Sequence, residues 1–234
     1  MECEPVQPAD DAGIFVAGRP RRHGLYDPAY EHDSCGVGFV AHIKGEPSHQ
    51  IVLDAYQMLR NMDHRGACGC EANTGDGSGI LTGLPWGFLE KVAREEMGVE
   101  LPAQGRFGAG LVFLPQIEAE RTKCIATVES IIAEQGQTCL GWRKVPVHTD
   151  KADVGPAARS AEPHIMQLFI GAAEGVEGDD FERQLYIIRK RASHQLRSDE
   201  SMEQALLFYI CSLSTKVMIY KGMLTTDQLL NYFS

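Results

Sequence analysis

The spacing of hydrophobic and polar side chains changes at about residue 35. Residues 1–34 are acidic and proline-rich, and neither helical nor alternating spacing of apolar residues persists there. From Cys35 onward, apolar residues recur at helix-like or strand-like intervals. This break predicts a leader or flexible extension over residues 1–34, removed on maturation, and a packed domain over residues 35–234.

Within the domain, short apolar runs alternate with amphipathic stretches. Apolar runs bounded by turn residues predict strands over 35–43, 80–85, 106–114, 138–147 and 163–171. Apolar residues three or four apart predict helices over 50–62, 86–97, 117–135, 181–195 and 226–233. The β-rich runs 206–214 and 217–220 predict a hairpin, while 73–79 and 150–160 are expected to be loops. This mixture is typical of layered sheets flanked by helices.

Composition narrows the class of protein. With 234 residues, 44% of them hydrophobic, the chain can bury a sizeable core. Its net charge of -10 argues against nucleic acid or an anionic membrane as the main partner. No apolar run approaches the ~20 residues that span a bilayer, and the N-terminus resembles neither a secretory signal nor an ordinary mitochondrial transit peptide. The odd count of seven cysteines predicts reduced thiols in the cytoplasm, with a plastid as the alternative.

Cys35 opens the predicted domain and is the candidate nucleophile. After removal of the leader, it would carry its own α-amine, whose ordinary pKa of about 7.7–8.0 lies near working pH. That amine could take the thiol proton and later return it, so one residue would supply nucleophile and base. The alternative is a buried cysteine at the start of a strand, because cysteine is among the most buried residue types.

Three further features invite a chemical interpretation. Arg65 follows the first predicted helix and could brace an oxyanion or a backbone carbonyl, although by itself it is better explained as a charge at a helix C-terminus. The loop Gly75–Gly79 lacks the Lys-Ser/Thr ending of a phosphate-binding loop, and Asp76 is expected to cap its amides. Cys68 and Cys70 lack the spacing and the second pair of a structural zinc site.

Five stretches, taken together and in order, resemble the amino end of the large chain of glutamate synthases. They are His32–Phe39, Asp63–Ala67, Asn73–Ile80, Leu185–Lys190 and Phe208–Ser214. In that family the region is a class II glutamine amidotransferase domain of the N-terminal-nucleophile hydrolase kind. The resemblance therefore implies an α+β fold, built as a four-layer αββα sandwich, and hydrolysis of the side-chain amide of L-glutamine.

The resemblance also implies roles for individual residues. By motif match, Cys35 takes the role of the nucleophile that forms a thioester, and Arg65 that of a supporting arginine. The released ammonia would travel to synthase domains of the same full-length chain, where 2-oxoglutarate becomes glutamate at FMN with the help of a 3Fe-4S cluster. Neither cofactor nor metal is expected within this chain. A small reductase subunit or ferredoxin is the implied electron-transfer partner, and the donor (ferredoxin, NADH or NADPH) stays open.

One departure from the family pattern limits what can be assigned. The family's Ser-Arg-Phe-Ser-Thr and Asn-Gly-Glu stretches, which grip glutamine and donate to the oxyanion, do not occur up to Ser234. We therefore expect the sandwich to be truncated at its C-terminal end, most substrate-binding residues to lie beyond Ser234, and the uncut fragment to have little activity. The alternatives are another class II amidotransferase, such as an amidophosphoribosyltransferase, and a non-catalytic regulatory domain of the same fold.

Overall fold

The computed structural model describes most of the chain beyond the predicted leader. The described residues are 15–16, 19–20, 22, 24, 27, 35–66, 68 and 71–233. The chain divides into two units, residues 1–36 and residues 37–234. In the first, β1 (Phe15–Val16) pairs antiparallel with β2 (Arg19–Pro20). Most of the predicted leader, together with Cys3 and Cys70, lies outside the described residues.

The second unit is built on a four-stranded antiparallel sheet. Its strands run in the order β5-β6-β4-β7, with β4 at Phe107–Leu114, β5 at Thr138–Lys144, β6 at His164–Gly171 and β7 at Tyr209–Ile210. β4 and β6 pair along their whole length, from Phe107 opposite Gly171 to Leu114 opposite His164. Both strands are almost wholly buried, as continuous apolar runs require, because the sheet is covered on both faces.

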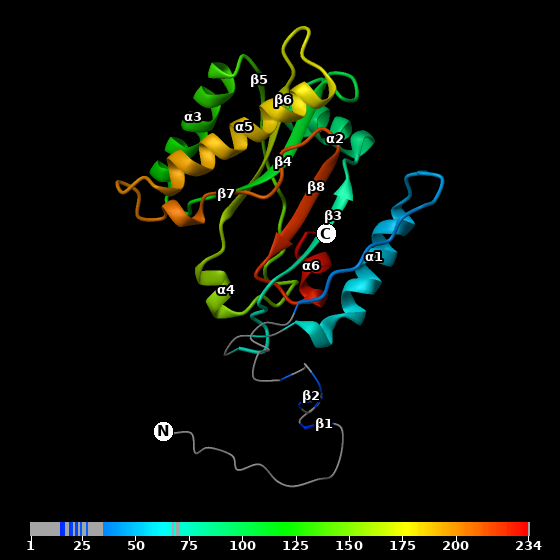
Figure 1. Cartoon of the computed structure of the whole chain (residues 1–234). Helices are drawn as coiled ribbons and strands as arrows, with labels where there is room; N and C mark the ends of the chain where they lie inside the picture. The colour runs from blue at the N-terminus through cyan, green and yellow to red at the C-terminus, as the bar shows by residue number, and fades with distance from the viewer. Residues whose placement is uncertain are drawn as a thin grey trace. The chain divides into compact units, whose positions relative to one another are not determined.

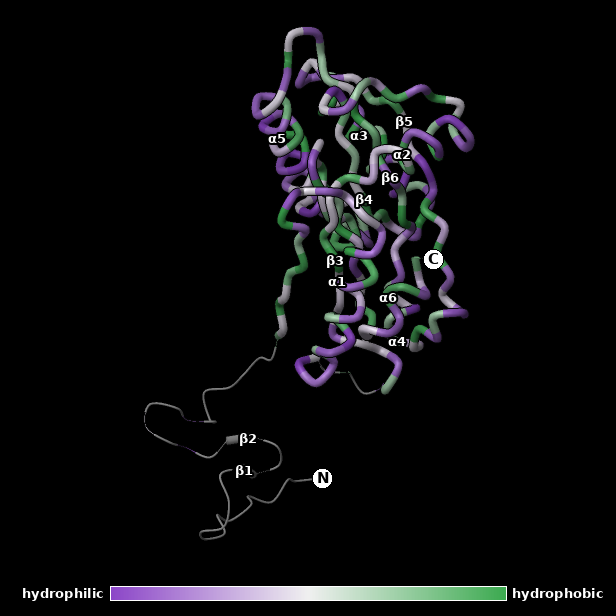
Figure 2. The backbone as a smooth tube through the Cα atoms, turned by 90° about the vertical axis from the view of Figure 1, so that its right-hand side faces the viewer, coloured by the Kyte–Doolittle hydropathy of each residue, from purple (hydrophilic) through white to green (hydrophobic). Residues whose placement is uncertain are grey.

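Two long helices cover one face of this sheet (Figure 1): α3 (Glu118–Glu134) and α5 (Gly178–Arg197). Figure 2 colours much of α5 as hydrophilic, yet one stripe of it faces the core. That stripe consists of Phe181, Leu185, Ile188, Ala192 and Leu196, at the spacing of one helical face. They pack with Val112, Leu114, Leu168 and Ile170 of the sheet to form the largest hydrophobic cluster.

A second sheet packs on the opposite face. It pairs β3 (Ser78–Gly83) with β8 (Val217–Gly222) antiparallel. Phe107, Ala109 and Phe169 of the first sheet form one buried cluster with Met218 of β8 and with Leu89 of α2 (Trp86–Val92). The interface between the two sheets is therefore a hydrophobic core of its own.

The outer face of the second sheet carries α1 (His49–Asn61) and α6 (Thr226–Tyr232). These helices contact each other and β3, so the layers run helix, sheet, sheet, helix within residues 37–234 (Figure 1). The predicted α+β four-layer arrangement is confirmed.

Two strand predictions are wrong. Residues 35–43 form no strand: Val37, Phe39 and Ile43 are 92%, 89% and 103% exposed. An apolar run favours a strand only where a neighbouring strand pairs with it, and the described residues show no such partner. Residues 206–220 form no hairpin either, because β7 pairs with β4 whereas β8 pairs with β3. The polar turn instead crosses between the two sheets.

Two helix boundaries also differ from the prediction. The expected loop at 150–160 contains α4 (Pro156–Ser160), which begins with a proline, a residue well suited to the first turn of a helix. The expected helix 86–97 is α2 followed by a π-helical turn, η3 (Ala93–Met97). A short 3-10 turn, η4 (Ala205–Leu207), precedes β7.

Candidate functional site

Cys35 is exposed and lies in neither a helix nor a strand. The alternative of a buried cysteine at the start of a strand is therefore wrong for the uncut chain. Cys35 belongs to the first unit and Arg65 to the second, so their pairing in one site remains a prediction from the sequence.

Arg65 ends η2 (Asp63–Arg65), a 3-10 turn that follows the C-cap of α1 at Met62. The backbone N–H of Arg65 donates to the carbonyl of Met62 at 2.8 Å, and that of Gly66 donates to the carbonyl of Asp63 at 3.0 Å. The side chain of Arg65 lies at the surface, on a turn separate from the helix. The basic residue in the last turn of α1 is instead Arg60, which fits the helix-terminus explanation better than Arg65 does.

Two polar contacts join the end of α1 and the Arg65 turn to the first turn of α6. The hydroxyl of Thr226 donates to Oδ1 of Asp63 at 2.8 Å. Three residues before Asp63, in α1, the Nε of Arg60 approaches Oδ1 of Asp227 at 2.6 Å. Residues far apart in sequence thereby fix the position of the segment that carries Arg65.

The glycine-rich loop meets the same end of α6. A Cβ at Gly75 would lie 2.5 Å from backbone atoms of Leu224 and Thr225, so only glycine fits there without a shift. Gly77 has φ of 135°, which L side chains rarely adopt. The hydroxyl of Ser78 donates to the carbonyl of Thr225 at 3.0 Å. The predicted loop is shorter than expected, because β3 begins at Ser78, and no described contact shows Asp76 capping it.

The side chain of Gln228 makes three hydrogen bonds at the start of α6. Its Oε1 accepts from the backbone N–H of Thr225 at 2.8 Å, as part of a capping box at the start of α6. Its Nε2 donates to the carbonyls of Asn73, at 2.8 Å, and Asp153, at 2.9 Å. Sequence reasoning missed this residue, although the Thr-x-x-Gln pattern at 225–228 is the recognised signal for such a box. The Arg65 turn and the glycine-rich loop thus converge on one helix end.

The family model for the class-II glutamine amidotransferases matches residues 35–234 and therefore begins at Cys35. The chain belongs to the class-II glutamine amidotransferases. The match covers the whole second unit, including both motifs that converge on α6.

Relatives of this amidotransferase are much longer proteins. It is 40% identical over 216 residues to "Glutamate synthase [NADPH] large chain" of Bacillus subtilis, covering 92% of this chain and 14% of that one. It is 43% identical over 226 residues to "Glutamate synthase [NADH]" of Schizosaccharomyces pombe, covering 94% and 10%. It is 40% identical over 203 residues to "Ferredoxin-dependent glutamate synthase, chloroplastic" of Oryza sativa subsp. japonica, covering 87% and 12%. The amidotransferase thus spans 10–14% of their length.

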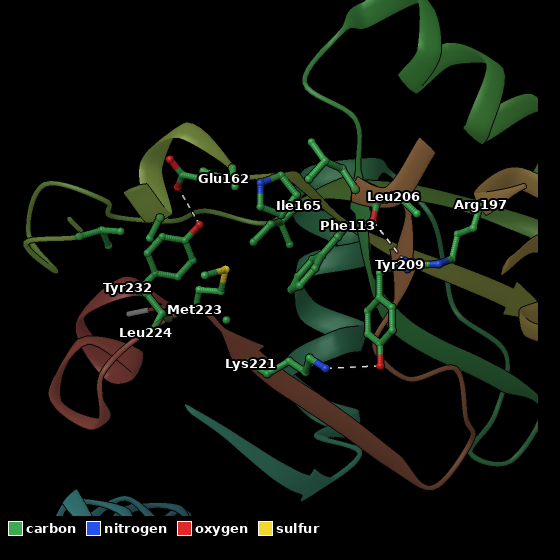
Figure 3. Close-up of a pocket in the computed structure, with 16 residues that line it drawn as sticks. Phe113, Glu162, Ile165, Arg197, Leu206, Tyr209, Lys221, Met223, Leu224 and Tyr232 are labelled. Atoms are coloured by element: carbon green, nitrogen blue, oxygen red, sulfur yellow. Dashed lines mark hydrogen bonds between the residues drawn. The ribbon is translucent and has the colours of Figure 1, made fainter. Parts of the chain in front are cut away.

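A cavity of about 280 Å³ in the amidotransferase lies between the two sheets' ends, α4 and α6 (Figure 3). Its walls are mostly apolar, with Phe113 and Ile165 at the centre. The hydroxyl of Tyr232 donates to Glu162 at 2.7 Å, and burial, followed by this carboxylate, raises its pKa. Among the described residues that line the cavity there is no cysteine, serine or histidine, so these residues do not offer the nucleophile that amide hydrolysis needs.

Three of the other described cysteines, Cys124, Cys139 and Cys211, are poor nucleophiles because burial raises their pKa values, whereas Cys68 is exposed. Burial raises the pKa of Cys124 to about 11 and that of Cys211 to about 12. Both side chains are buried, whereas Cys35 is exposed. Among the residues that the structure describes, no group of three or more His, Cys, Asp or Glu side chains could hold a metal ion. In the same part of the chain, no helix is both long and apolar enough to cross a membrane.

Proposed function

We propose that this amidotransferase is the glutaminase part of a glutamate synthase and hydrolyses the side-chain amide of L-glutamine through a thioester on Cys35. The observation that carries the proposal is the family match, which begins at Cys35 and extends over the whole domain. The relatives' names support the synthase over the alternative of an amidophosphoribosyltransferase.

In this proposal, residues 1–34 are removed, and Cys35 gains its own α-amine. The exposed backbone around Cys35, which pairs with no strand in the described residues, supports access by a processing activity. Burial and raised pKa values disfavour Cys124 and Cys211 as the reactive thiol. Cys35 and Cys68 are both exposed, and the family match, which begins at Cys35, favours Cys35.

The proposed hydrolysis has two stages, formation of a thioester on Cys35 and its hydrolysis by water. The α-amine takes the proton of the Cys35 thiol, and the sulfur attacks the side-chain amide carbon of glutamine, whose oxygen becomes an oxyanion. When the C–N bond breaks, the protonated amine gives its proton to the leaving nitrogen, and ammonia departs. Water, deprotonated by the same amine, then attacks the thioester carbon. The C–S bond breaks, glutamate leaves, and the sulfur regains its proton.

Arg65 supports this reaction by binding oxygen atoms of the substrate. Its planar guanidinium carries five N–H donors, which match the geometry of a carboxylate or a developing oxyanion. Its surface position on η2 leaves it accessible to a small substrate. Loss of substrate binding would raise KM, whereas loss of oxyanion stabilisation would lower kcat.

The released ammonia would serve synthase domains elsewhere in a longer chain, since the relatives are about seven to ten times as long as the matched region. There, 2-oxoglutarate would become glutamate at FMN, with electrons passing through a 3Fe-4S cluster from ferredoxin or a reductase subunit. The buried thiols of Cys124 and Cys211 do not fit a 3Fe-4S cluster, because its ligands are thiolates and burial raises the pKa of both groups. The odd cysteine count supports a cytoplasmic location, and the chloroplastic relative keeps a plastid as the alternative.

The test uses the full-length protein that contains this chain. Intact mass should show a mature N-terminus at Cys35. A glutamine analogue bearing an electrophile should label Cys35, and Cys35→Ser should abolish both labelling and ammonia release from glutamine. A fully active enzyme that keeps residues 1–34, or labelling at Cys68 or Cys70 in place of Cys35, would contradict the proposal.

A further inference from the structure

The turn that carries Arg65 has little hydrophobic support. No residue of η2 is buried, and none of α1 is buried either. Leu59 of α1 is partly buried against the cluster that includes Leu229 and Tyr232 of α6. The exact position of Arg65 must therefore depend on polar contacts made by the turn itself.

Asp63 makes two such contacts, one through its side-chain carboxylate and one through its backbone carbonyl. Its carboxylate accepts the hydroxyl of Thr226 at 2.8 Å, and its carbonyl accepts the N–H of Gly66 at 3.0 Å. Arg65 lies between Asp63 and Gly66, so both ends of its turn are fixed through Asp63.

Thr226 is itself held firmly. It follows Thr225, whose N–H is bound by Gln228, and Gln228 is bound to the carbonyls of Asn73 and Asp153. The hydroxyl of Thr226 thus lies at a helix end that is hydrogen-bonded to two other segments. The neighbouring ion pair of Arg60 and Asp227 joins α1 to the same helix end and involves no residue of η2.

We propose that Asp63 and Thr226 are a positioning pair that sets the orientation of Arg65 toward the substrate. This inference rests on the proposed function. Without the hydrogen bond, the turn loses the contact through which Asp63 joins it to α6. Arg65 then samples orientations in which its donors do not meet the substrate, and a misplacement of about 1 Å can impair catalysis strongly.

The experiment compares glutamine kinetics of single and double variants in the full-length, processed enzyme. Arg65→Lys first identifies whether KM or kcat depends on the guanidinium, because lysine lacks its planar fork. Thr226→Val and Asp63→Ala should each change the same constant in the same direction, by roughly tenfold, as expected for one hydrogen bond to a charged group. The double variant should be no worse than either single one.

Two controls separate positioning from general destabilisation. Thr226→Ser keeps the hydroxyl and should restore wild-type kinetics. Thr122→Val removes an exposed hydroxyl that donates to the carbonyl of Glu118 on α3, far from η2 in the sequence, and should leave glutamine kinetics unchanged. Wild-type kinetics in Thr226→Val and Asp63→Ala, or fully additive losses in the double variant, would overturn the positioning role of Asp63 and Thr226. Neither result would contradict the proposed function. A wild-type enzyme that does not hydrolyse glutamine would overturn the proposed function as well.

Discussion

Glu182 of α5 binds Thr215 twice at the point where the chain crosses from the first sheet to the second. Its carboxylate accepts the backbone N–H of Thr215 at 2.6 Å and also the Thr215 hydroxyl. It accepts the hydroxyl of Ser214 as well, at 3.1 Å. Ser214 and Thr215 are both buried, so this one carboxylate satisfies polar groups that water cannot reach.

Glu182→Ala should therefore destabilise the domain by about 2–3 kcal/mol, because it leaves buried donors without an acceptor. Glu182→Gln should cost less, since one amide oxygen can still accept. Chemical denaturation of the variants would measure this. The control is Glu90→Ala, at an exposed position of α2, which should change the unfolding free energy by less than about 0.5 kcal/mol. Equal stability of Glu182→Ala and wild type would contradict the role of this carboxylate.

A second prediction concerns the ion pair between Glu96 of η3 and Arg143 of β5. The Nε and one terminal nitrogen of Arg143 approach the two carboxylate oxygens at 2.7 and 2.8 Å, and the Arg143 side chain is only 7% exposed. Glu96→Gln should destabilise the domain, because it leaves a buried guanidinium without its carboxylate. Replacing both residues, as in Glu96→Gln with Arg143→Met, should recover part of the loss in a denaturation experiment.

The same pair predicts a pH dependence. The hydrogen bond from Arg143 lowers the pKa of Glu96 below its ordinary value of 4.5. A carboxyl group with a lowered pKa in the folded state adds stability at neutral pH, and that contribution is lost as the pH falls through its folded-state pKa. The stability gap between wild type and Glu96→Gln should thus be full near pH 7 and shrink below about pH 4.5. A gap that stays constant down to pH 2 would show that the charge of Glu96 is irrelevant.

The residue pattern predicted the helices and the central strands because their burial follows local periodicity. The stripe from Phe181 to Leu196 is visible in the sequence, and so are the apolar runs of β4 and β6. Local composition does not identify the strand with which a given strand pairs. The run at 206–220 has the composition of a hairpin, but a contact with Glu182 of α5 holds its middle at a crossover between sheets. Such contacts join residues over 30 positions apart and leave no local signal.

The same limit applies to the residues of the candidate site. Cys35 and Arg65 were found from motifs, whereas Thr226 and Gln228 came only from the structure. Their roles depend on which segments α6 contacts, and periodicity predicts only that a helix exists there. The strand predicted at 35–43 failed for a related reason, since strand composition does not specify a partner.

A fourth prediction concerns Gly75. Gly75→Ala would bring a methyl group within 2.5 Å of the backbone at Leu224 and Thr225, where no flexible side chain can move aside. We expect a loss of about 1–3 kcal/mol, typical of overpacking. Gly87→Ala is the matched control, because a Cβ there meets nothing within 4 Å and alanine favours the helix. Thermal unfolding of both variants would test this, and a Gly75→Ala protein as stable as Gly87→Ala would argue against the close approach.

The last prediction separates the chemistry of Cys35 from its packing. Cys35 is exposed, so Cys35→Ser should leave the unfolding temperature unchanged while abolishing glutamine hydrolysis in the full-length enzyme. Cys211→Ser should do the reverse, because it places a hydroxyl in a buried apolar cluster and lowers stability without removing the nucleophile. Ammonia release should also be measured for a form of the enzyme that retains residues 1–34. Its Cys35 nitrogen is an amide that cannot act as a base, so it should release ammonia far more slowly than the processed form, even with the thiol intact. Equal rates from the two forms would exclude the α-amine as the base, whatever the outcome for Cys35→Ser.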